Sequence, residues 1–426
     1  MNCEEAIELI HSHGSYQAAP GLSRISRLLE QLGNPQESLR CIHVAGTNGK
    51  GSTCAMMHSI LQAAGYRVGL FTSPYIREFR ERIRINGEPL AESDLVEWTE
   101  RVLRLSHEMG ESFTEFELIT AIGFAYFKSQ KVDIVVLEVG LGGRFDPTNV
   151  IKSPMLSIIT GIDFDHTALL GNTIQTIAAE KAGIVKESCP VLYGGEENAA
   201  CRTIRTFADL RHAPFHTVDR SSFRQREATL DGTVFDFGEY QGLELSLLGT
   251  YQPYNAGIVL SALNILKEAH GLTVPESAVR EGLKSVTWQA RFELLSKDPI
   301  IIYDGGHNPQ GVHSAVKSVQ AYFPEERVNI LSGVMMDKDF DAMIEALKPV
   351  AGKIFTVTPH NPRALSAKEY AEHCKRHGLT AQAYDSVKDA VGEAVRQSRE
   401  DSVPLICLGS LYLYQEISSA ITEYIG

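Results

Sequence analysis

A glycine-rich segment with a single lysine, Gly46-Thr47-Asn48-Gly49-Lys50-Gly51-Ser52, has the composition of a phosphate-binding loop. It lies between a predicted strand over 41–45 and a predicted helix over about 52–64. In such loops glycines let backbone N–H groups approach phosphate oxygens, and the helix N-terminus adds a positive dipole. We therefore predict that this segment binds a nucleoside triphosphate, with Lys50 on the β- and γ-phosphates.

The segment departs from the standard phosphate-loop pattern, because Gly51 stands between Lys50 and Ser52 and only two residues separate Gly46 from Gly49. The alternative interpretation is an ordinary glycine-rich turn. The apolar strand before the segment and the amphipathic helix after it favour the phosphate loop. The chain has no [NT]-K-x-D guanine-specificity pattern, so we expect ATP rather than GTP.

Polar groups end three further predicted strands, and the carboxyl ends of parallel strands are where ligands gather. These groups are Thr72-Ser73-Pro74, Glu138 and the string Asp163-Phe164-Asp165-His166. A magnesium ion carried with ATP needs a few hard oxygen ligands, and imidazole can serve as well. Glu138 has the place of a Walker-B-type acid. The alternatives are that Glu138 is a buried acid paired with an arginine such as Arg144, and that His166 is structural.

Two other strings have functional and structural interpretations. Gly140-Leu141-Gly142-Gly143 resembles a nicotinamide-binding turn, but Phe145 replaces the third glycine and no suitable acid follows. Asp304 to Pro309 begins a predicted helix, in which Asn308 can cap and Pro309 suits the first position. Capping does not require Asp304 or His307, so a second set of ATP contacts is expected there.

The elements that position these residues alternate between short β-branched runs and helical periodicity, which indicates an α/β fold with mainly parallel strands. Near Asp298-Pro299 the alternation restarts as a self-contained series. We predict two domains: 1–295, with the phosphate loop, and 296–426, a smaller Rossmann-like α/β domain. The first domain's other strands are predicted over 68–71, 134–139 and 156–160, with helices over about 95–107, 116–128 and 255–269 and a polar strand-like stretch over about 215–248. The second domain's strands are predicted over 300–303, 328–331, 354–357 and 405–408, with helices beginning near 309, 340, 366 and 387.

Composition limits the class of protein. The formal net charge of −13 argues against a nucleic-acid or anionic-membrane binder, and no apolar run is long enough to span a bilayer. The seven cysteines are scattered without a C-x-x-C pair, and the N-terminal residues lack a secretory pattern, so a cytoplasmic protein is expected. Positive charge gathers locally at Arg77, Arg80, Arg82 and Arg84, either as a solvated face or as an anion site.

Together these strings resemble the Mur ligase superfamily, and within it the folylpolyglutamate synthase/dihydrofolate synthase family. The resemblance covers nearly the whole chain, and its strength lies in the number of strings that occur in the same order. Besides the phosphate loop they are Pro20-Gly21-Leu22 with Arg24, Phe71 to Pro74, Glu81-Arg82, Ile85-Asn86-Gly87, Thr114 to Glu117, Glu138 to Asn149, Asp163 to His166, Glu180 to Ile184, Gln252 to Ala256, Arg291-Phe292-Glu293, Asp304 to Pro309, Pro362-Arg363-Ala364 and Gly409 to Tyr412.

The resemblance implies roles for individual residues. Implied ATP contacts are Asn48, Gly49, Lys50, Gly51, Ser52, Asn255, Arg291, Asp304 and His307. Implied substrate contacts are Ala18, Ala19, Pro20, Arg82, Thr114, Glu115, Phe116, Glu117, Phe145, Asp146, Pro147 and Ser410. Implied magnesium ligands, for two ions, are Ser73, Glu138, His166 and Lys181. Catalytic roles fall to Lys50, Glu138, His166 and Lys181.

Lys181 matches a lysine that is carbamylated in many members of the family. Its alternative is a lysine in the last turn of a helix, where it interacts favourably with the dipole. Two positions depart from the family pattern: Gly306 stands where alanine is usual, and Pro147 where alanine or serine is common. Neither departure removes a functional side chain.

The chemistry implied by the resemblance is ATP-dependent amide formation, with L-glutamate joined to a folate or dihydropteroate carboxylate through an acyl phosphate. A monomer is expected. Three other hypotheses remain open from the sequence: a cell-wall amino-acid ligase of the same superfamily, a non-ligase ATP-binding module, and a nicotinamide oxidoreductase. Which of the two pteridine substrates is used also stays open.

Overall fold

The computed structural model describes residues 1–14 and 21–425. The chain forms two compact units, and both are discontinuous in sequence. Unit 1 comprises Met1–Phe223 and Asn255–Val286, and unit 2 comprises Arg224–Tyr254 and Thr287–Gly426. The predicted domain boundary between residues 295 and 296 stays a proposal. The last segment of unit 1 ends at residue 286, the next segment of unit 2 begins at residue 287, and unit 2 also includes the earlier segment Arg224–Tyr254.

Unit 1 is built on an eight-stranded sheet in the order β4-β3-β2-β5-β1-β6-β7-β8. Strands β2, β5, β1, β6, β7 and β8 are parallel, whereas β3 pairs antiparallel with β2 and with β4 at one edge. The strands are β1 Cys41–Ala45, β2 Val68–Phe71, β3 Ile83–Ile85, β4 Glu88–Pro89, β5 Ile134–Glu138, β6 Leu156–Ile159, β7 Val191–Tyr193 and β8 Phe215–Thr217.

The helices of unit 1 cover both faces of this sheet. Helix α3 packs on β1, β2 and β5, and α10 packs on α3. The α-helices are α1 Cys3–Ser12, α2 Ser23–Gln31, α3 Lys50–Ala63, α4 Glu92–Met109, α5 Glu115–Ser129, α6 Thr167–Leu170, α7 Ile174–Lys181, α8 Ala199–Leu210, α9 Gln252–His270 and α10 Glu276–Ser285. The 3-10 turns are η1 Pro35–Ser38, η2 Phe79–Arg82, η3 Pro147–Val150, η4 Ala182–Ile184 and η5 Arg220–Ser222.

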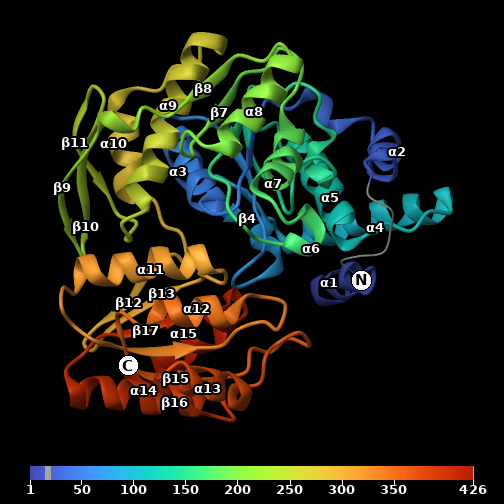
Figure 1. Cartoon of the computed structure of the whole chain (residues 1–426). Coiled ribbons are helices and arrows are strands. Elements are labelled where there is room, and N and C mark those ends of the chain that lie inside the picture. Colours follow the sequence, from blue (N-terminus) through green and yellow to red (C-terminus); the bar gives the residue numbers. More distant parts are fainter. Residues whose placement is uncertain (15–20, 426) are drawn as a thin grey trace. The chain divides into compact units, whose positions relative to one another are not determined.

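Unit 2 contains a six-stranded sheet in the order β12-β13-β17-β14-β15-β16 and a three-stranded antiparallel sheet in the order β11-β10-β9. In the larger sheet α11 and α12 lie on one face, while α14 lies on the other (Figure 1). The strands are β9 Phe223–Thr229, β10 Gly232–Phe237, β11 Tyr240–Leu245, β12 Glu293–Lys297, β13 Ile300–Asp304, β14 Val328–Ser332, β15 Ala351–Thr356, β16 Thr380–Ala383 and β17 Leu405–Leu408. The helices are α11 Pro309–Tyr322, α12 Phe340–Leu347, α13 Ala367–Arg376, α14 Val387–Asp401, η6 Leu411–Leu413 and α15 Tyr414–Ile425.

The predicted α/β class is confirmed, with a sheet that is mixed rather than wholly parallel. Predicted strands 41–45, 68–71 and 405–408 have the observed bounds. Helix α3 begins two residues earlier than predicted, at Lys50, because Gly49 takes a left-handed conformation with φ 85° and serves as its N-cap. The edge strands β3 and β4 were not predicted, since the arginine-rich sequence there lacks a clear alternating pattern.

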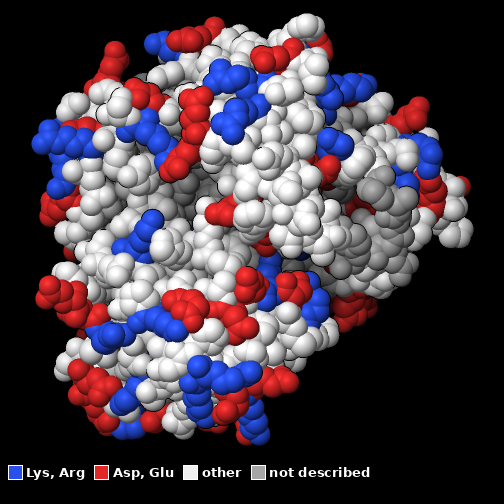
Figure 2. All heavy atoms as spheres, in the orientation of Figure 1, with Lys and Arg blue, Asp and Glu red and all other residues white. Residues whose placement is uncertain are grey.

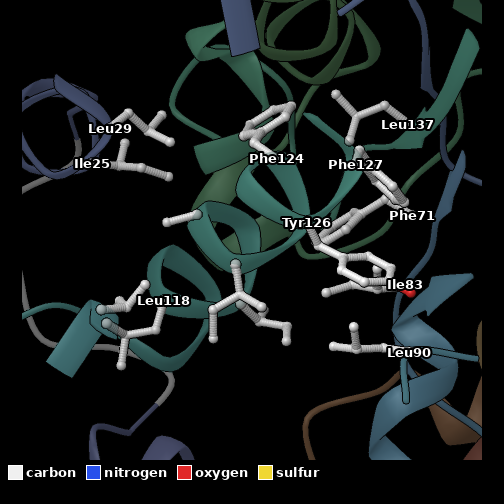
Figure 3. Packing of buried hydrophobic residues seen from close by; sticks show 14 of the residues in the cluster. Ile25, Leu29, Phe71, Ile83, Leu90, Leu118, Phe124, Tyr126, Phe127 and Leu137 are labelled. Carbon is white, nitrogen blue, oxygen red and sulfur yellow. The ribbon is translucent and has the colours of Figure 1, made fainter. Parts of the chain in front are cut away.

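One apolar cluster of unit 1 lies between the sheet and α5. Phe71, Phe124, Phe127 and Leu137 meet there (Figure 3), and each is at most 1% exposed. The near-continuous apolar composition of β1, β2 and β5 is what a parallel strand covered on both faces requires. Within residues 1–14 and 21–425, no helix is long and apolar enough to cross a membrane.

The packing of α10 on α3 leaves no room for a side chain at Gly282. A Cβ there would lie 2.5 Å from the Ile60 Cα atom and 2.7 Å from the Ile60 amide nitrogen. We predict that Gly282→Ala lowers the midpoint of thermal unfolding, because overpacking against backbone costs about 1–3 kcal/mol. That cost exceeds the gain of about 0.5–1 kcal/mol from alanine in a helix.

The matched control is Gly21→Ala, because nothing lies within 4 Å of its Cβ position. Differential scanning calorimetry of both variants measures the effect. A Gly282→Ala protein as stable as the wild type would show that α3 and α10 pack less closely than described.

Candidate functional site

The phosphate loop connects the end of β1 to the start of α3 in unit 1. Its glycines have a steric reason: a Cβ at Gly46 would lie 1.9 Å from the Thr160 hydroxyl oxygen, and one at Gly49 would lie 2.7 Å from the Asn255 side-chain oxygen. Asn255 of α9, a predicted ATP contact, therefore lies beside the loop. Lys50 points back over the loop, where its Nζ donates to the carbonyl oxygens of Gly46 at 3.0 Å and Thr47 at 3.1 Å.

The loop is held from β6 by residues that the sequence analysis missed. The Thr160 hydroxyl donates to the Asn48 carbonyl oxygen at 2.7 Å. The Thr47 amide donates to the Gly161 carbonyl oxygen at 2.8 Å, and the Thr47 hydroxyl donates to the Asp163 carbonyl oxygen at 3.1 Å. The sequence contains only a weak indication of this role for Thr160. It is a threonine at the end of a strand, and no sequence pattern links it to the phosphate loop more than a hundred residues earlier.

Lys181 reaches the same loop from the end of α7. Its Nζ donates to the Gly46 carbonyl oxygen at 2.8 Å, and the residue is only 5% exposed. Burial lowers the pKa of Lys181 to about 7, and the neighbouring Lys50 ammonium adds to this effect. The Asp165 and Asp146 carboxylates oppose the shift more weakly. Lys181 is thus a buried amine at the phosphate loop, not merely a cation at a helix end.

Two of the predicted magnesium ligands are in contact. The Ser73 amide donates to the Glu138 Oε2 atom at 3.1 Å, and Glu138 is 4% exposed at the end of β5. Arg144, the partner considered for Glu138, lies 3.6 Å from Glu180. His166 follows β6 with φ 48°, and its amide donates to the Asp165 carboxylate at 2.9 Å.

The donor set fits a hard cation, since it combines a buried carboxylate, a hydroxyl and an imidazole. In the described part of the chain, no three His, Cys, Asp or Glu side chains are placed to hold a metal ion. The assignment of Ser73, Glu138, His166 and Lys181 to magnesium stays a prediction.

The predicted substrate segment Thr114–Glu117 forms the first turn of α5. Thr114 accepts from the Glu117 amide, while the Glu117 carboxylate accepts from the Thr114 amide and hydroxyl, which makes a capping box. Glu117 also pairs with Arg24 at 3.1 Å. This segment therefore has a structural role that the sequence analysis did not assign.

The arginine cluster is paired with acidic residues within unit 1. Arg82 lies 3.4 Å from Glu115, and its guanidinium sits 5.1 Å from the centre of the Tyr75 ring. Arg80 pairs with Glu78, and Arg84 with Glu81. On the face shown in Figure 2, basic and acidic side chains are likewise interspersed.

The loop after β5 brings Phe116 and Asp146 together at Gly140. A Cβ at Gly140 would lie 2.5 Å from the Phe116 ring and 3.2 Å from the Asp146 Oδ2 atom. Asp146 is buried as the N-cap of η3, with Pro147 at the first position, whereas Phe145 is 45% exposed. Burial raises the pKa of Asp146, while hydrogen bonds from Thr148 and from backbone amides act in the opposite direction. The predicted contacts Ala18, Ala19 and Pro20 lie outside the described residues.

The remaining predicted residues belong to unit 2, at the carboxyl ends of β13 and β17. Asp304 accepts from the Tyr251 hydroxyl at 2.7 Å and from the Phe292 amide at 2.9 Å, and burial raises its pKa. His307 Nδ1 donates to the Gly305 carbonyl oxygen at 2.9 Å. The guanidinium of Arg291 donates to the Ala290 carbonyl oxygen at 2.9 Å.

Several expectations about the start of α11 are confirmed, and one departure is explained. Asn308 caps α11 by accepting from the Gly311 amide at 2.8 Å, with Pro309 in the first position. A Cβ at Gly306 would lie 2.8 Å from the Asp304 Oδ1 atom, so glycine suits this chain where alanine is usual in the family.

Ser410, a predicted substrate contact, caps η6 by accepting a hydrogen bond from the Tyr412 amide.

Comparison with family models matches residues 44–263 to the Mur ligase middle domain and residues 290–410 to the Mur ligase glutamate ligase domain. The dihydrofolate synthase/folylpolyglutamate synthase of Bacillus subtilis is 36% identical, over 97% of this chain and 98% of its own. The chain belongs to the folylpolyglutamate synthase/dihydrofolate synthase family of Mur ligases. It is therefore a ligase, which excludes the nicotinamide oxidoreductase and the non-ligase module.

Solved structures of the folylpolyglutamate synthase family share the fold. The Mycobacterium tuberculosis folylpolyglutamate synthase complexed with ADP has a TM-score of 0.88 at 29% identity, covering 99% of this chain and 98% of that one. The Escherichia coli family member in complex with DHPP and ADP has a TM-score of 0.87 at 29% identity, covering 100% and 99%. These nucleotide complexes support nucleotide binding by this member of the family.

We predict that Gly49→Ala weakens ADP binding about tenfold or more. The new methyl group must displace Asn255 or the loop, since only 2.7 Å separates its position from the Asn255 oxygen. Gly65→Ala is the matched control, because Gly65 has a similar φ of 90° but nothing within 4 Å of its Cβ position. Isothermal titration calorimetry with ADP and Mg²⁺ measures both. Equal affinities for the two variants would contradict the steric role of Gly49.

Proposed function

We propose that this ligase joins L-glutamate to the carboxylate of a folate or of 7,8-dihydropteroate, with ATP as the energy source. The observation that carries the proposal is the convergence of Lys50 and Lys181 on the carbonyl oxygen of Gly46 in the phosphate loop. Relatives over nearly the whole chain are named for both activities. Both substrates are therefore proposed.

In the proposed reaction the substrate carboxylate attacks the γ-phosphate of ATP in line, which forms an acyl phosphate and releases ADP. The amine of glutamate then attacks the acyl carbon, and phosphate leaves. Lys50 turns from the carbonyl oxygens of its own loop to the phosphates and neutralises the developing charge. The loop glycines let the backbone amides of the α3 N-terminus approach the same phosphates.

Ser73, Glu138 and His166, with Lys181 once modified, are the residues proposed to hold two magnesium ions. Magnesium bound with ATP supplies charge neutralisation and polarises the transferred phosphoryl group. The buried Glu138 carboxylate, oriented by the Ser73 amide, supplies the strongest oxygen donor of this set. Two ions are proposed from the family resemblance.

Lys181 is proposed to be carbamylated. Carbamate formation needs a neutral amine, and burial lowers the pKa of Lys181 to about 7, so a substantial neutral fraction exists at physiological pH. The resulting carbamate would place a negative charge beside the Lys50 ammonium, where the unmodified amine is partly neutral. Repulsion between the two side chains then becomes attraction.

The substrate site is proposed at the loop after β5 and the first turn of α5, where Phe116 and Asp146 meet at Gly140. The other proposed substrate contacts there are Arg82, Thr114, Glu115, Glu117, Phe145 and Pro147. Arg291, Asp304 and His307 are proposed ATP contacts of unit 2, and Ser410 a substrate contact. The protein is proposed to act in the cytoplasm as a monomer, without nucleic-acid or membrane partners.

We predict that Lys50→Ala and Glu138→Ala each lower glutamate ligation at least about a hundredfold, because each removes charge stabilisation made at the transferred phosphate. Labelled-glutamate incorporation with ATP and magnesium measures the rate, with dihydropteroate and tetrahydrofolate tested separately. Lys152→Ala and Glu187→Ala remove exposed charges of the same types and serve as controls.

Near-normal turnover in the Lys50 or Glu138 variant would refute the site assignment. Absence of product from both substrates with the wild-type protein would instead refute the proposed function. A cell-wall ligase would be indicated if a UDP-sugar substrate alone were used.

The proposed carbamate gives a separate test. In ¹³C-bicarbonate the wild-type protein should show a carbamate carbonyl signal by NMR, and Lys181→Arg should lose it, because arginine has no amine to modify. Lys186→Arg is the matched control: the pKa of Lys186 is also lowered, to about 8, but its Nζ donates to the Asn149 carbonyl oxygen. A signal that persists in Lys181→Arg would place the modification elsewhere.

A further inference from the structure

His43 is a buried polar residue in the middle of β1, the strand that runs into the phosphate loop. It is fully buried, and its neighbours along the strand, Ile42 and Val44, are also fully buried. Burial lowers the pKa of His43 to about 3, and the Lys186 cation contributes, so the imidazole is neutral at physiological pH. A neutral imidazole in an apolar strand is costly unless its N–H is paired.

The partner of His43 is Thr148 in η3, which is itself fully buried. The His43 Nε2 atom lies 2.9 Å from the Thr148 hydroxyl oxygen. That hydroxyl donates to the Asp146 Oδ1 atom, and the Thr148 amide donates to the same oxygen at 3.0 Å. Three buried groups on two elements thus form one chain of hydrogen bonds, from the centre of the sheet to the loop after β5.

The direction of this chain fixes the tautomer of His43. A hydroxyl has one hydrogen, and Thr148 directs it to Asp146, so the hydroxyl oxygen accepts on the side of His43. His43 must then carry its hydrogen on Nε2 and a lone pair on Nδ1. Among the described residues, Nδ1 has no hydrogen-bond partner, and an unpaired lone pair costs less than a buried unpaired N–H.

Asp146, at the end of the chain, organises the loop between β5 and η3. Its Oδ2 atom accepts from the Leu141 amide at 2.8 Å, which closes the loop on itself. Asn149 adds a second anchor, because its Nδ2 atom donates to the Arg144 and Gly183 carbonyl oxygens at 3.0 and 3.1 Å.

The loop also packs closely on the end of α7. A Cβ at Gly143 would lie 2.8 Å from the Glu180 carbonyl oxygen and 2.9 Å from that of Lys181. A shift of this loop would therefore displace the backbone of Lys181, and the Nζ atom of Lys181 contacts the phosphate loop.

We propose that His43, as the Nε2–H tautomer, is a positioning residue that acts through Thr148 on the Asp146 carboxylate and holds the loop after β5 in register with the phosphate loop. Strand β1 carries His43 and ends next to Gly46. One strand therefore determines the positions of both the phosphate loop and the loop after β5. The consequence for turnover rests on the proposed function, in which this loop contacts the pteridine substrate. The tautomer and the hydrogen-bond chain do not depend on that function.

The first test is independent of activity. In protein labelled with ¹⁵N at histidine, His43 should show the Nε2–H tautomer by NMR, and it should not titrate between pH 5 and 9 because its pKa is about 3. Thr148→Val removes the acceptor with little change in shape, so the ring signals of His43 should change. The Nδ1–H tautomer in the wild type, or unchanged ring signals in Thr148→Val, would overturn the proposal.

The second test separates positioning from general destabilisation by matched pairs of variants. His43→Gln and Thr148→Ser keep a donor and a hydroxyl, whereas His43→Leu and Thr148→Val lose them. We expect His43→Leu and Thr148→Val to raise the KM for the pteridine substrate about tenfold, with the KM for ATP nearly unchanged. Thr148→Val loses the hydroxyl that donates to the Asp146 carboxylate, and His43→Leu loses the donor that orients this hydroxyl. The conservative pair should stay within about twofold of the wild type.

The outcomes are distinguishable. The positioning role would be overturned if His43→Leu had the same kinetics as His43→Gln and Thr148→Val the same kinetics as Thr148→Ser. It would also be overturned if the KM for ATP rose as much as the KM for the pteridine substrate. If the wild type ligates neither dihydropteroate nor tetrahydrofolate, the proposed function fails, and the NMR test alone decides whether the His43 chain exists. If His43→Leu and Thr148→Val do not fold, the wild-type tautomer still decides that question.

Discussion

The carbonyl oxygen of Gly46 accepts hydrogen bonds from two lysines, and much of the site in unit 1 depends on this contact. Lys50 comes from the start of α3 and Lys181 from the end of α7, so one backbone oxygen ties two helices to the end of β1. The contact is possible only because Gly46 has no side chain, since Thr160 occupies the place of a Cβ. It also places the buried Lys181 amine beside the Lys50 ammonium, which favours the neutral form of Lys181.

The sequence alone was sufficient for the fold class, the phosphate loop and several of the strands, because these depend on local patterns. Apolar runs such as 41–45 and 405–408 gave bounds that match the structure. The helix start at Asn308-Pro309 was also predictable, since capping chemistry is local. The short antiparallel strands β3 and β4 escaped prediction because their pairing with β2 is set by tertiary contacts rather than by periodicity.

The sequence was less informative about the site, because the deciding contacts join residues far apart in the chain. Nothing local marks Thr160 as the partner of Asn48, or Lys181 as a partner of Gly46. The arginine cluster seemed a possible anion site, yet the structure pairs its Arg80, Arg82 and Arg84 with glutamates. The Thr114–Glu117 string was assigned to substrate, and the structure shows that it also caps α5.

The contact of Lys50 and Lys181 at one oxygen of Gly46 would also couple proton uptake to nucleotide affinity. While Lys181 is an unmodified amine, the Lys50 ammonium beside it favours the neutral form. Triphosphate oxygens in the loop would add negative charge and draw Lys50 away, and both changes favour the protonated amine. Binding would then take up a proton, and by reciprocity acidification would tighten binding. A carbamylated Lys181 has no basic amine and would not contribute this proton uptake, so the slope of affinity against pH distinguishes the two chemical forms of Lys181.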